Sequence, residues 1–178
     1  MPLFMDPPEA GEFNPYYAKY IERVPRGDFI EVLARQADET LSILRAIPDN
    51  AADYAYAEGK WTIKEVVGHV CDAERIFAYR MLRIGRADRT PLPGFDENAY
   101  APAGQFGERT FASLTEEFAA VRAATIALVA GMPSEAWLRT GTASDATVSA
   151  RALAFIIAGH ELHHRAMLME RYLPQLTS

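Results

Sequence analysis

Cysteine, long apolar runs and an excess of basic residues are scarce or missing in this sequence. Its one cysteine, Cys71, cannot form an internal disulfide, so nothing requires an oxidising compartment. The absence of a signal-peptide pattern and of any apolar run near ~20 residues predicts a cytoplasmic protein that does not enter a membrane. The 18 basic residues face 24 acidic ones, for a net charge of −6, so no nucleic-acid partner is expected.

Histidine is scarce as well. The four histidines are His69, His160, His163 and His164, and the last three fall within five residues. The rest of the composition is ordinary, with 49% apolar and 24% charged residues, which is typical of a globular protein and not of a disordered chain. The length of 178 residues fits one domain with a sizeable core.

The first residues differ in composition from the remainder of the chain. Pro2, Pro7, Pro8 and Gly11 lie close together and favour an extended segment. We therefore expect an N-terminal extended arm over residues 1–14 and a single domain over residues 15–178, which opens with a short aromatic turn or helix over residues 15–21.

Apolar residues recur at helical spacing in four segments, residues 29–47, 62–85, 114–129 and 148–172. Asp28 and Thr62 are predicted N-caps, and the third helix is capped by Thr110 or Ser113. Pro48 ends the first helix and Pro174 the last. No segment shows the alternating pattern of a strand, and residues 134–147 are expected to be a turn-rich connector. The sequence predicts an all-α four-helix bundle.

A long crossover, residues 86–110, separates the second and third predicted helices. It contains Pro91, Pro93 and Pro102, with an acidic segment at residues 95–98 in its middle. Loops longer than about 12–15 residues usually carry a function or some structure of their own.

The fourth predicted helix carries two histidines on its apolar stripe. His160 and His164 are four residues apart, so their side chains lie on one face and can converge on one ion. His69 lies at the edge of the apolar stripe of the second predicted helix and can meet them if the two helices pack together. Three neutral imidazoles leave a fourth position open, as in catalytic zinc sites. His163 points about 60° away, towards the surface or the outer shell of the site.

Other readings of these residues remain open. Histidines on an apolar face can be hydrogen-bonded core residues. The run from His160 to His164 also matches the zinc-peptidase pattern H-E-x-x-H, with Glu161 as general base, but it lacks a suitable third ligand downstream. Glu74 can orient a ligand histidine, or form an ion pair with Arg80 or with an arginine on another helix. Cys71 faces a different side from His69 and is expected to be a core residue.

An ordered set of segments resembles the DinB-like (DinB/YfiT) superfamily. The resemblance is carried by Gly68-His69 with the residues around it, by the crossover and by the histidine-rich helix, and it extends from about residue 16 to residue 172. The matching segments are residues 59–65, 68–69, 72–75, 93–100 and 158–165.

The resemblance implies an up-down-down-up bundle, often a homodimer, with zinc or nickel bound by three histidines. The family ligands match His69, His160 and His164. Members with known chemistry include transferases and isomerases that use low-molecular-weight thiols, while others are described as metal-dependent hydrolases. We expect no extra C-terminal domain of the kind found in the mycothiol-dependent isomerases, which argues against that particular activity.

We therefore expect a metal-dependent enzyme in which a metal-bound water or thiol reacts with a small molecule, as a thiol transferase or a hydrolase. The alternatives are a stress-related protein that binds a metal or small ligand without chemistry, and a structural bundle whose histidines belong to the core.

Overall fold

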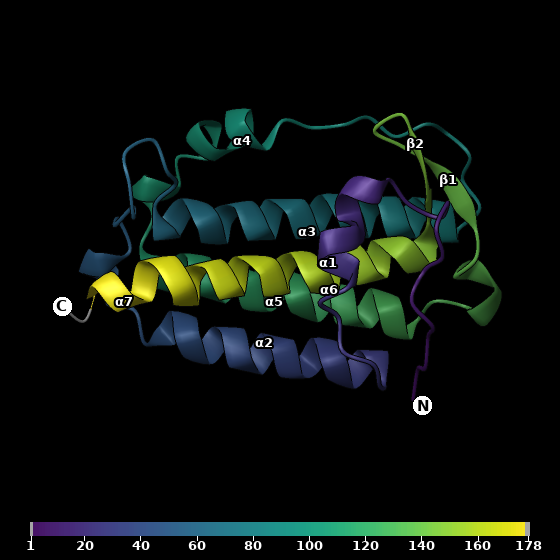
Figure 1. Cartoon of the computed structure of the whole chain (residues 1–178), viewed down its shortest axis with the longest axis horizontal. Helices are drawn as coiled ribbons and strands as arrows, with labels where there is room; N and C mark the ends of the chain where they lie inside the picture. The colour runs from purple at the N-terminus through teal and green to yellow at the C-terminus, as the bar shows by residue number, and fades with distance from the viewer. Residues whose placement is uncertain (1, 177–178) are drawn as a thin grey trace.

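Four long helices pack side by side in the computed structural model, which describes residues 2–176. They are α2 (Phe29–Arg45), α3 (Ile63–Gly85), α5 (Phe111–Ala130) and α6 (Ala150–Met167). In Figure 1, α3 and α5 run in one direction and α2 and α6 in the other, so the order along the chain is up, down, down, up. The predicted bundle topology, with its long crossover between the second and third bundle helices, is confirmed.

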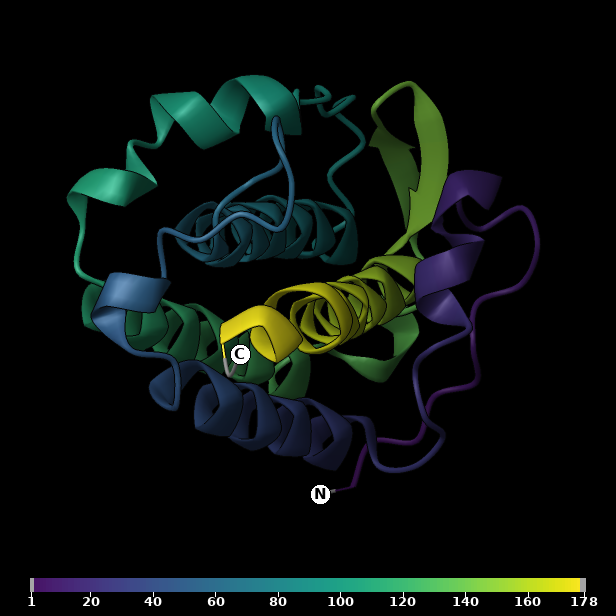
Figure 2. The same cartoon turned by 60° about the vertical axis from the view of Figure 1, so that its left-hand side comes forward.

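Short elements connect the bundle helices and cover one side of them. In Figure 2, α4 (Glu97–Ala103), the β-hairpin of residues 140–149 and α1 (Ala18–Ile21) follow one another around the side formed by α3 and α6. The short elements are the 3-10 turns Pro15–Tyr17, Asp49–Ala51, Phe106–Glu108 and Ser134–Ala136, the helices α1 (Ala18–Ile21), α4 (Glu97–Ala103) and α7 (Leu173–Leu176), and the π-helical turn Leu168–Tyr172.

Side-chain caps set where the long helices begin. Asp28 accepts the backbone N–H of Ile30, and Thr62 forms a full capping box with Glu65, as predicted. Thr110 caps α5, which therefore begins three residues earlier than the apolar pattern indicated. Ser149 accepts the backbone N–H of Ala152 and fixes the start of α6.

The expectation of a strand-free connector at residues 134–147 is wrong. Strand β1 (Thr140–Ala143) pairs antiparallel with β2 (Ala146–Ser149), and Thr140 lies opposite Ser149. The turn residues Ser144 and Asp145 have φ angles of 51° and 60°, the left-handed backbone of a tight hairpin turn. Such turns are usually signalled by Asn-Gly or Asp-Gly, and this chain uses two non-glycine residues.

The predicted helix end at Pro174 is also wrong. The last bundle helix continues through the π-helical turn into α7, and Pro174 lies in the first turn of α7. The π-helical turn comes directly before α7, and across it the backbone N–H of Leu173 donates to the backbone oxygen of Leu168.

The N-terminal arm reaches the start of α6. The backbone N–H of Leu3 donates to Asp28 over 3.0 Å, and Glu12 accepts the Ser149 hydroxyl over 2.6 Å and the Arg151 guanidinium. These contacts fix the arm across the ends of α2 and α6.

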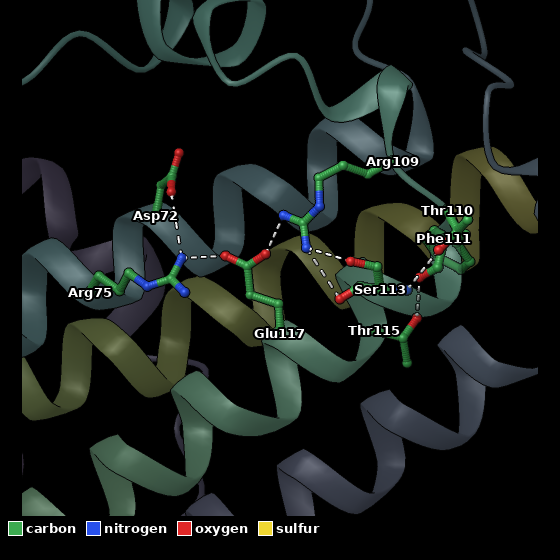
Figure 3. Close-up of polar contacts among 8 residues, drawn as sticks. All are labelled: Asp72, Arg75, Arg109, Thr110, Phe111, Ser113, Thr115 and Glu117. Atoms are coloured by element: carbon green, nitrogen blue, oxygen red, sulfur yellow. Dashed lines mark hydrogen bonds and ion pairs between the residues drawn. The ribbon is translucent and has the colours of Figure 1, made fainter.

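Figure 3 shows an ion-pair network that joins the end of the crossover to the bundle. The carboxylate of Glu117 on α5 accepts hydrogen bonds from Arg75 of α3 and from Arg109 in the segment before α5. Arg109 also donates to the Ser113 hydroxyl over 2.7 Å, and Arg75 lies 3.8 Å from Asp72. The returning chain is thus held against both α3 and α5.

The apolar core consists of two clusters. One surrounds the first half of α6 and the second half of α3, and the other gathers the first half of α3, the start of α5 and the C-terminal turns. Along α6, residues 160–164 lie between the two clusters, which places polar side chains in the middle of the bundle. No helix within residues 2–176 is long and apolar enough to cross a membrane.

Candidate metal centre

Helices α3 and α6 bring three histidines together inside the bundle. The Nε2 atom of His160 lies 3.1 Å from the Nε2 atom of His69 and 3.1 Å from that of His164. One ring nitrogen from each residue lies within 4.8 Å of those of the other two. All three side chains are buried, at 7–8% exposure. The trio selected from helical spacing is therefore assembled in space.

Each of the two helices has a glycine directly before its histidine, and both glycines allow another segment to come close. A Cβ on Gly68 would meet the Phe106 ring at 2.5 Å, and a Cβ on Gly159 would meet the backbone oxygen of Tyr20 at 2.0 Å. Gly68 thus admits the crossover beside His69, and Gly159 admits α1 beside His160. The Gly-His pairs fix how closely the covering segments pack over the histidines.

Burial keeps the three imidazoles neutral. It lowers the pKa of His69 to about 4, an effect that the nearby carboxylate of Glu97 partly opposes. Burial, followed by the neighbouring histidines, lowers the pKa of His160 and of His164 well below the usual value. A neutral imidazole has a lone pair on one ring nitrogen, which is the form that binds metal ions.

The donor set fits a divalent metal ion. A ring nitrogen offers either one proton or one lone pair, so the His160 Nε2 atom cannot form good hydrogen bonds with both of its neighbours. At a metal–nitrogen distance of about 2.05 Å, two ligand nitrogens are about 3.3 Å apart at a tetrahedral angle and about 2.9 Å at a right angle. The two separations from the His160 Nε2 atom, to His69 and to His164, are both 3.1 Å and lie between these values.

A pocket of about 300 Å³ lies over the histidines. Its walls come from the 3-10 turn Pro15–Tyr17, α1, the connector before α3, the crossover, the hairpin tip and both histidine-bearing helices. The described residues that line it are Tyr16, Tyr17, Lys19, Tyr20, Trp61, His69, Ala73, Phe77, Phe95, Glu97, Asn98, Ser144, His160, His163 and His164. Residues 2–14 of the arm are not among them, so the 3-10 turn and α1, and not the arm, cover the site.

Aromatic rings surround the cluster and charged groups lie at the pocket wall. The ring centroid of Trp61 is 4.8 Å from that of His69, and the Tyr20 ring is 5.4 Å from that of His160. The Lys19 ammonium lies 3.9 Å from the Tyr16 ring centroid, so a cation–π contact holds this exposed cation at the pocket. Glu97 of the acidic crossover segment supplies a carboxylate to the same pocket.

Arg80 fastens the crossover to the hairpin. Its guanidinium donates to the backbone oxygen of Pro93 over 2.6 Å and to the Ser144 hydroxyl over 3.0 Å. Leu92 and Ser144 add two backbone hydrogen bonds, because Leu92 donates to Thr142 and Ser144 donates to Leu92. This attachment brings the hairpin tip into the pocket wall.

Glu74 pairs with an arginine on another helix. The Nε and Nη2 atoms of Arg122 each donate over 2.9 Å to one oxygen of Glu74, and Nη1 donates over 3.2 Å to Gln36. Both Glu74 and Arg122 are buried. Of the two roles open to Glu74, the structure favours the ion pair, with Arg122 of α5 as its partner in place of Arg80.

The remaining candidates lie apart from the three ring nitrogens. Glu161 is buried, does not line the pocket and accepts the Thr40 hydroxyl, so its position does not suit a general base at the site. His163 lines the pocket with its ring 5.2 Å from that of Tyr20. Cys71 is fully buried and burial raises its thiol pKa, which confirms it as a core residue.

Sequence reasoning missed the pocket wall. Lys19, Tyr20 and Trp61 lie beside the histidines although no helical spacing connects them to His69 or His160. The one available signal was the group of three tyrosines within residues 15–21, which is unusual for a surface turn.

Comparisons with known proteins agree with this architecture. A model of the DinB superfamily matches residues 33–168. A protein of Oceanobacillus iheyensis, provisionally named a metal-dependent hydrolase, is 30% identical over 73 residues. That match spans only 40% of each chain.

Solved structures share the fold. YfiT from Bacillus subtilis, described as a probable metal-dependent hydrolase with an unusual four-helix bundle topology, has a TM-score of 0.67 at 16% identity, over 94% of this chain and 92% of its own. The mycothiol-dependent maleylpyruvate isomerase has a TM-score of 0.66 at 13% identity, over 78% and 58%. The DinB-like protein YjoA from Bacillus subtilis has a TM-score of 0.62 at 19% identity, over 84% and 92%.

Proposed function

The chain belongs to the DinB superfamily, whose model covers well over half of it, and from this premise we propose that it is a metal-dependent enzyme acting on a small molecule. The observation that carries the proposal is the cluster of three neutral, buried histidines at one pocket. His69, His160 and His164 are the proposed ligands of one divalent ion, for which zinc and nickel are our candidates. Imidazole nitrogens suit both metals.

A divalent ion held by three imidazoles lowers the pKa of water or of a thiol, and so supplies a nucleophile near neutral pH. Because the ligands are neutral, they leave the charge of the ion uncompensated, which favours an anionic group beside them. Tyr20, Phe77 and Trp61 surround the histidines with rings, which keeps bulk water away from the reacting atoms.

The remaining pocket residues bind and orient the substrate in this proposal. Lys19 offers a cation and Glu97 a carboxylate, so polar or charged parts of a small molecule can be held at the pocket wall. A volume of about 300 Å³ is at the lower end for small-molecule sites. We propose transfer of a low-molecular-weight thiol or hydrolysis as the reaction, and the name of the mycothiol-dependent relative in fold supports testing thiols first.

Elemental analysis of the purified protein is the first test. We expect one zinc or nickel per chain, lost in His160→Ala and retained in His163→Ala, because His163 is not one of the three converging residues. Protein without metal that also fails to bind added Zn²⁺ or Ni²⁺ would refute the metal centre.

Activity is tested separately, with a panel of small thiols offered together with electrophilic substrates, and with a panel of esters and amides. We expect turnover that depends on the metal in one panel. Stoichiometric metal with no turnover in either panel would refute the proposed enzyme activity. It would favour a non-catalytic metal-binding protein instead.

We also propose that the protein is a cytoplasmic homodimer without a nucleic-acid or membrane partner. Analytical ultracentrifugation should give a mass near twice the chain mass of 19.8 kDa. Cell fractionation should recover the protein with cytoplasmic markers.

A further inference from the structure

Two buried polar atoms close to the histidine cluster have no hydrogen-bond partner among the described residues. They are Nδ1 of His164 and Oε2 of Glu161. His164 is 8% exposed and Glu161 is 2% exposed, so neither atom faces solvent. Unpaired buried polar atoms are costly, and each one in a folded protein calls for an explanation.

The two atoms are complementary in type. When the Nε2 atom of His164 presents its lone pair to an ion, the proton of the neutral ring is on Nδ1, which becomes a donor. The Oε2 atom of Glu161 is an acceptor. The two residues are three positions apart on α6 and are therefore neighbours on one face of the helix.

Both residues line the same small cavity. Its volume is about 20 Å³, enough for a single water molecule. Thr40 lines it as well, and its hydroxyl donates to Oε1 of Glu161 while keeping lone pairs free to accept. The other wall residues are mainly apolar: Leu44, Val66, Val67, Val70, Phe118 and Leu168, together with the Arg165 side chain.

We propose that one water molecule in this cavity accepts the Nδ1 proton of His164 and donates to Glu161 and Thr40, so that Glu161 positions His164 as a metal ligand. The inference rests on the proposed metal centre. Three bonds are the usual number for a buried water, and this arrangement satisfies both unpaired atoms. Glu161 is thus a positioning residue that acts on the ion through His164, on the side of His164 away from the pocket.

The role of Glu161 predicts a loss of metal affinity when its carboxylate is replaced. Glu161→Gln keeps the size of the side chain but replaces one of its two acceptor oxygens, both of which the proposed arrangement uses, with an NH₂ donor. Co²⁺ is the probe, because its visible absorption reports the ligand geometry. We expect the dissociation constant to rise about 10–100-fold, as for other residues that orient metal-bound histidines, with a changed Co²⁺ spectrum.

Val66→Ile tests the water itself. The added methylene fills the cavity and removes no polar group, so it should weaken Co²⁺ binding in the same direction as Glu161→Gln. Thr125→Val is the matched control, because Thr125 is a buried polar residue of α5 whose hydroxyl donates to the backbone of its own helix and which does not line the cavity. It should leave the Co²⁺ affinity and spectrum unchanged.

The possible outcomes separate the proposals. A purely structural role for Glu161 would lower the melting temperature of the metal-free protein and leave affinity and spectrum unchanged, which would overturn the inference. Weak Co²⁺ binding in Glu161→Gln with normal Co²⁺ binding in Val66→Ile would overturn the water. It would indicate that Glu161 contacts His164 directly. Wild-type protein that binds no Co²⁺ would overturn the proposed metal centre and this inference with it, whereas tight wild-type binding with an unaffected Glu161→Gln variant would overturn the inference alone.

Discussion

Arg122 is fully buried, and its charge is met by Glu74, which is 3% exposed. The two nitrogen–oxygen pairs form a bidentate contact between α5 and α3. The third guanidinium nitrogen, Nη1, donates a hydrogen bond to Gln36 of α2. A buried ion pair gains little net free energy over an apolar pair, but removing one partner leaves a charge without compensation. The contact between α5 and α3 can therefore be tested by comparing the loss of one partner with the loss of both.

Arg122→Met should lower the free energy of unfolding by about 3–5 kcal/mol, because the Glu74 carboxylate is left buried without its partner. The double variant Arg122→Met with Glu74→Leu should be more stable than Arg122→Met alone. Urea denaturation of the metal-free Arg122→Met, Glu74→Leu and double variants measures these changes. A double variant that loses the sum of the two single effects would show that the residues do not interact.

The same residues show how far sequence reasoning reaches at this scale. His160 and His164 could be paired because a helix fixes the relation between residues four apart. Glu74 and Arg122 could not, because their contact depends on which faces of α3 and α5 meet, and Arg80 was an equally good partner by charge. His69 lies between these cases, since its place at the site required only that α3 and α6 be neighbours.

At the scale of elements, α1 is held on α6 through Gly159. A Cβ at this position would meet the backbone oxygen of Tyr20 at 2.0 Å and its carbonyl carbon at 2.4 Å. Backbone atoms cannot move aside as a flexible side chain can, so a larger residue must shift the whole of α1. Lys19 and Tyr20 would move with α1, and both line the pocket.

Gly159→Ala should therefore lower the free energy of unfolding by about 1–3 kcal/mol, although alanine is favoured over glycine in helices by about 1 kcal/mol. Zn²⁺ binding should persist because all three histidines remain, while binding of small molecules should weaken. Gly107→Ala is the control, since a Cβ there meets no atom within 4 Å. Urea denaturation and Zn²⁺ titration provide the measurements, and a Gly159→Ala variant at least as stable as wild type would contradict the packing.

The hairpin shows why some elements could not be predicted from the sequence. Its strands are only four residues long, and the turn at Ser144 and Asp145 lacks the glycine that usually marks such a turn. It is attached to Arg80 of α3, 64 residues before Ser144, and to Leu92 of the crossover, about fifty residues earlier in the chain. The pocket wall that it forms is therefore a product of tertiary packing, whereas the four long helices follow from local apolar spacing and caps.

Glu117 makes the stability of the junction between α3, α5 and the crossover depend on pH. Burial alone would raise the pKa of Glu117, but hydrogen bonds and charges from Arg75 and Arg109 outweigh it and lower the pKa below the ordinary value of 4.5. A folded-state pKa below the unfolded value gives stability that is present above pH 4.5 and is lost as the pH falls through the folded value.

Glu117→Gln should therefore cost about 1 kcal/mol at neutral pH, a modest value because the groups are partly exposed. The difference from wild type should shrink as the pH falls below 4.5. Glu116→Gln, at the exposed neighbouring position, should match wild type throughout. Denaturation curves collected from pH 7 to pH 3 test this, and a difference that does not change with pH would exclude the ion pairs as its source.

For the molecule as a whole, the proposed ion joins α3 to α6 at residues 91 positions apart. An ion that binds only the folded chain must stabilise it, by about 2.7 kcal/mol at a free concentration 100 times the dissociation constant. For a chain of this size, that corresponds to a melting temperature about 5–10 °C higher.

Zn²⁺ should produce this shift in wild type and in His163→Ala but not in His160→Ala, as measured by differential scanning calorimetry. An equal shift in His160→Ala would place the ion elsewhere, because His160 is the one residue whose Nε2 atom lies 3.1 Å from both other ligand atoms.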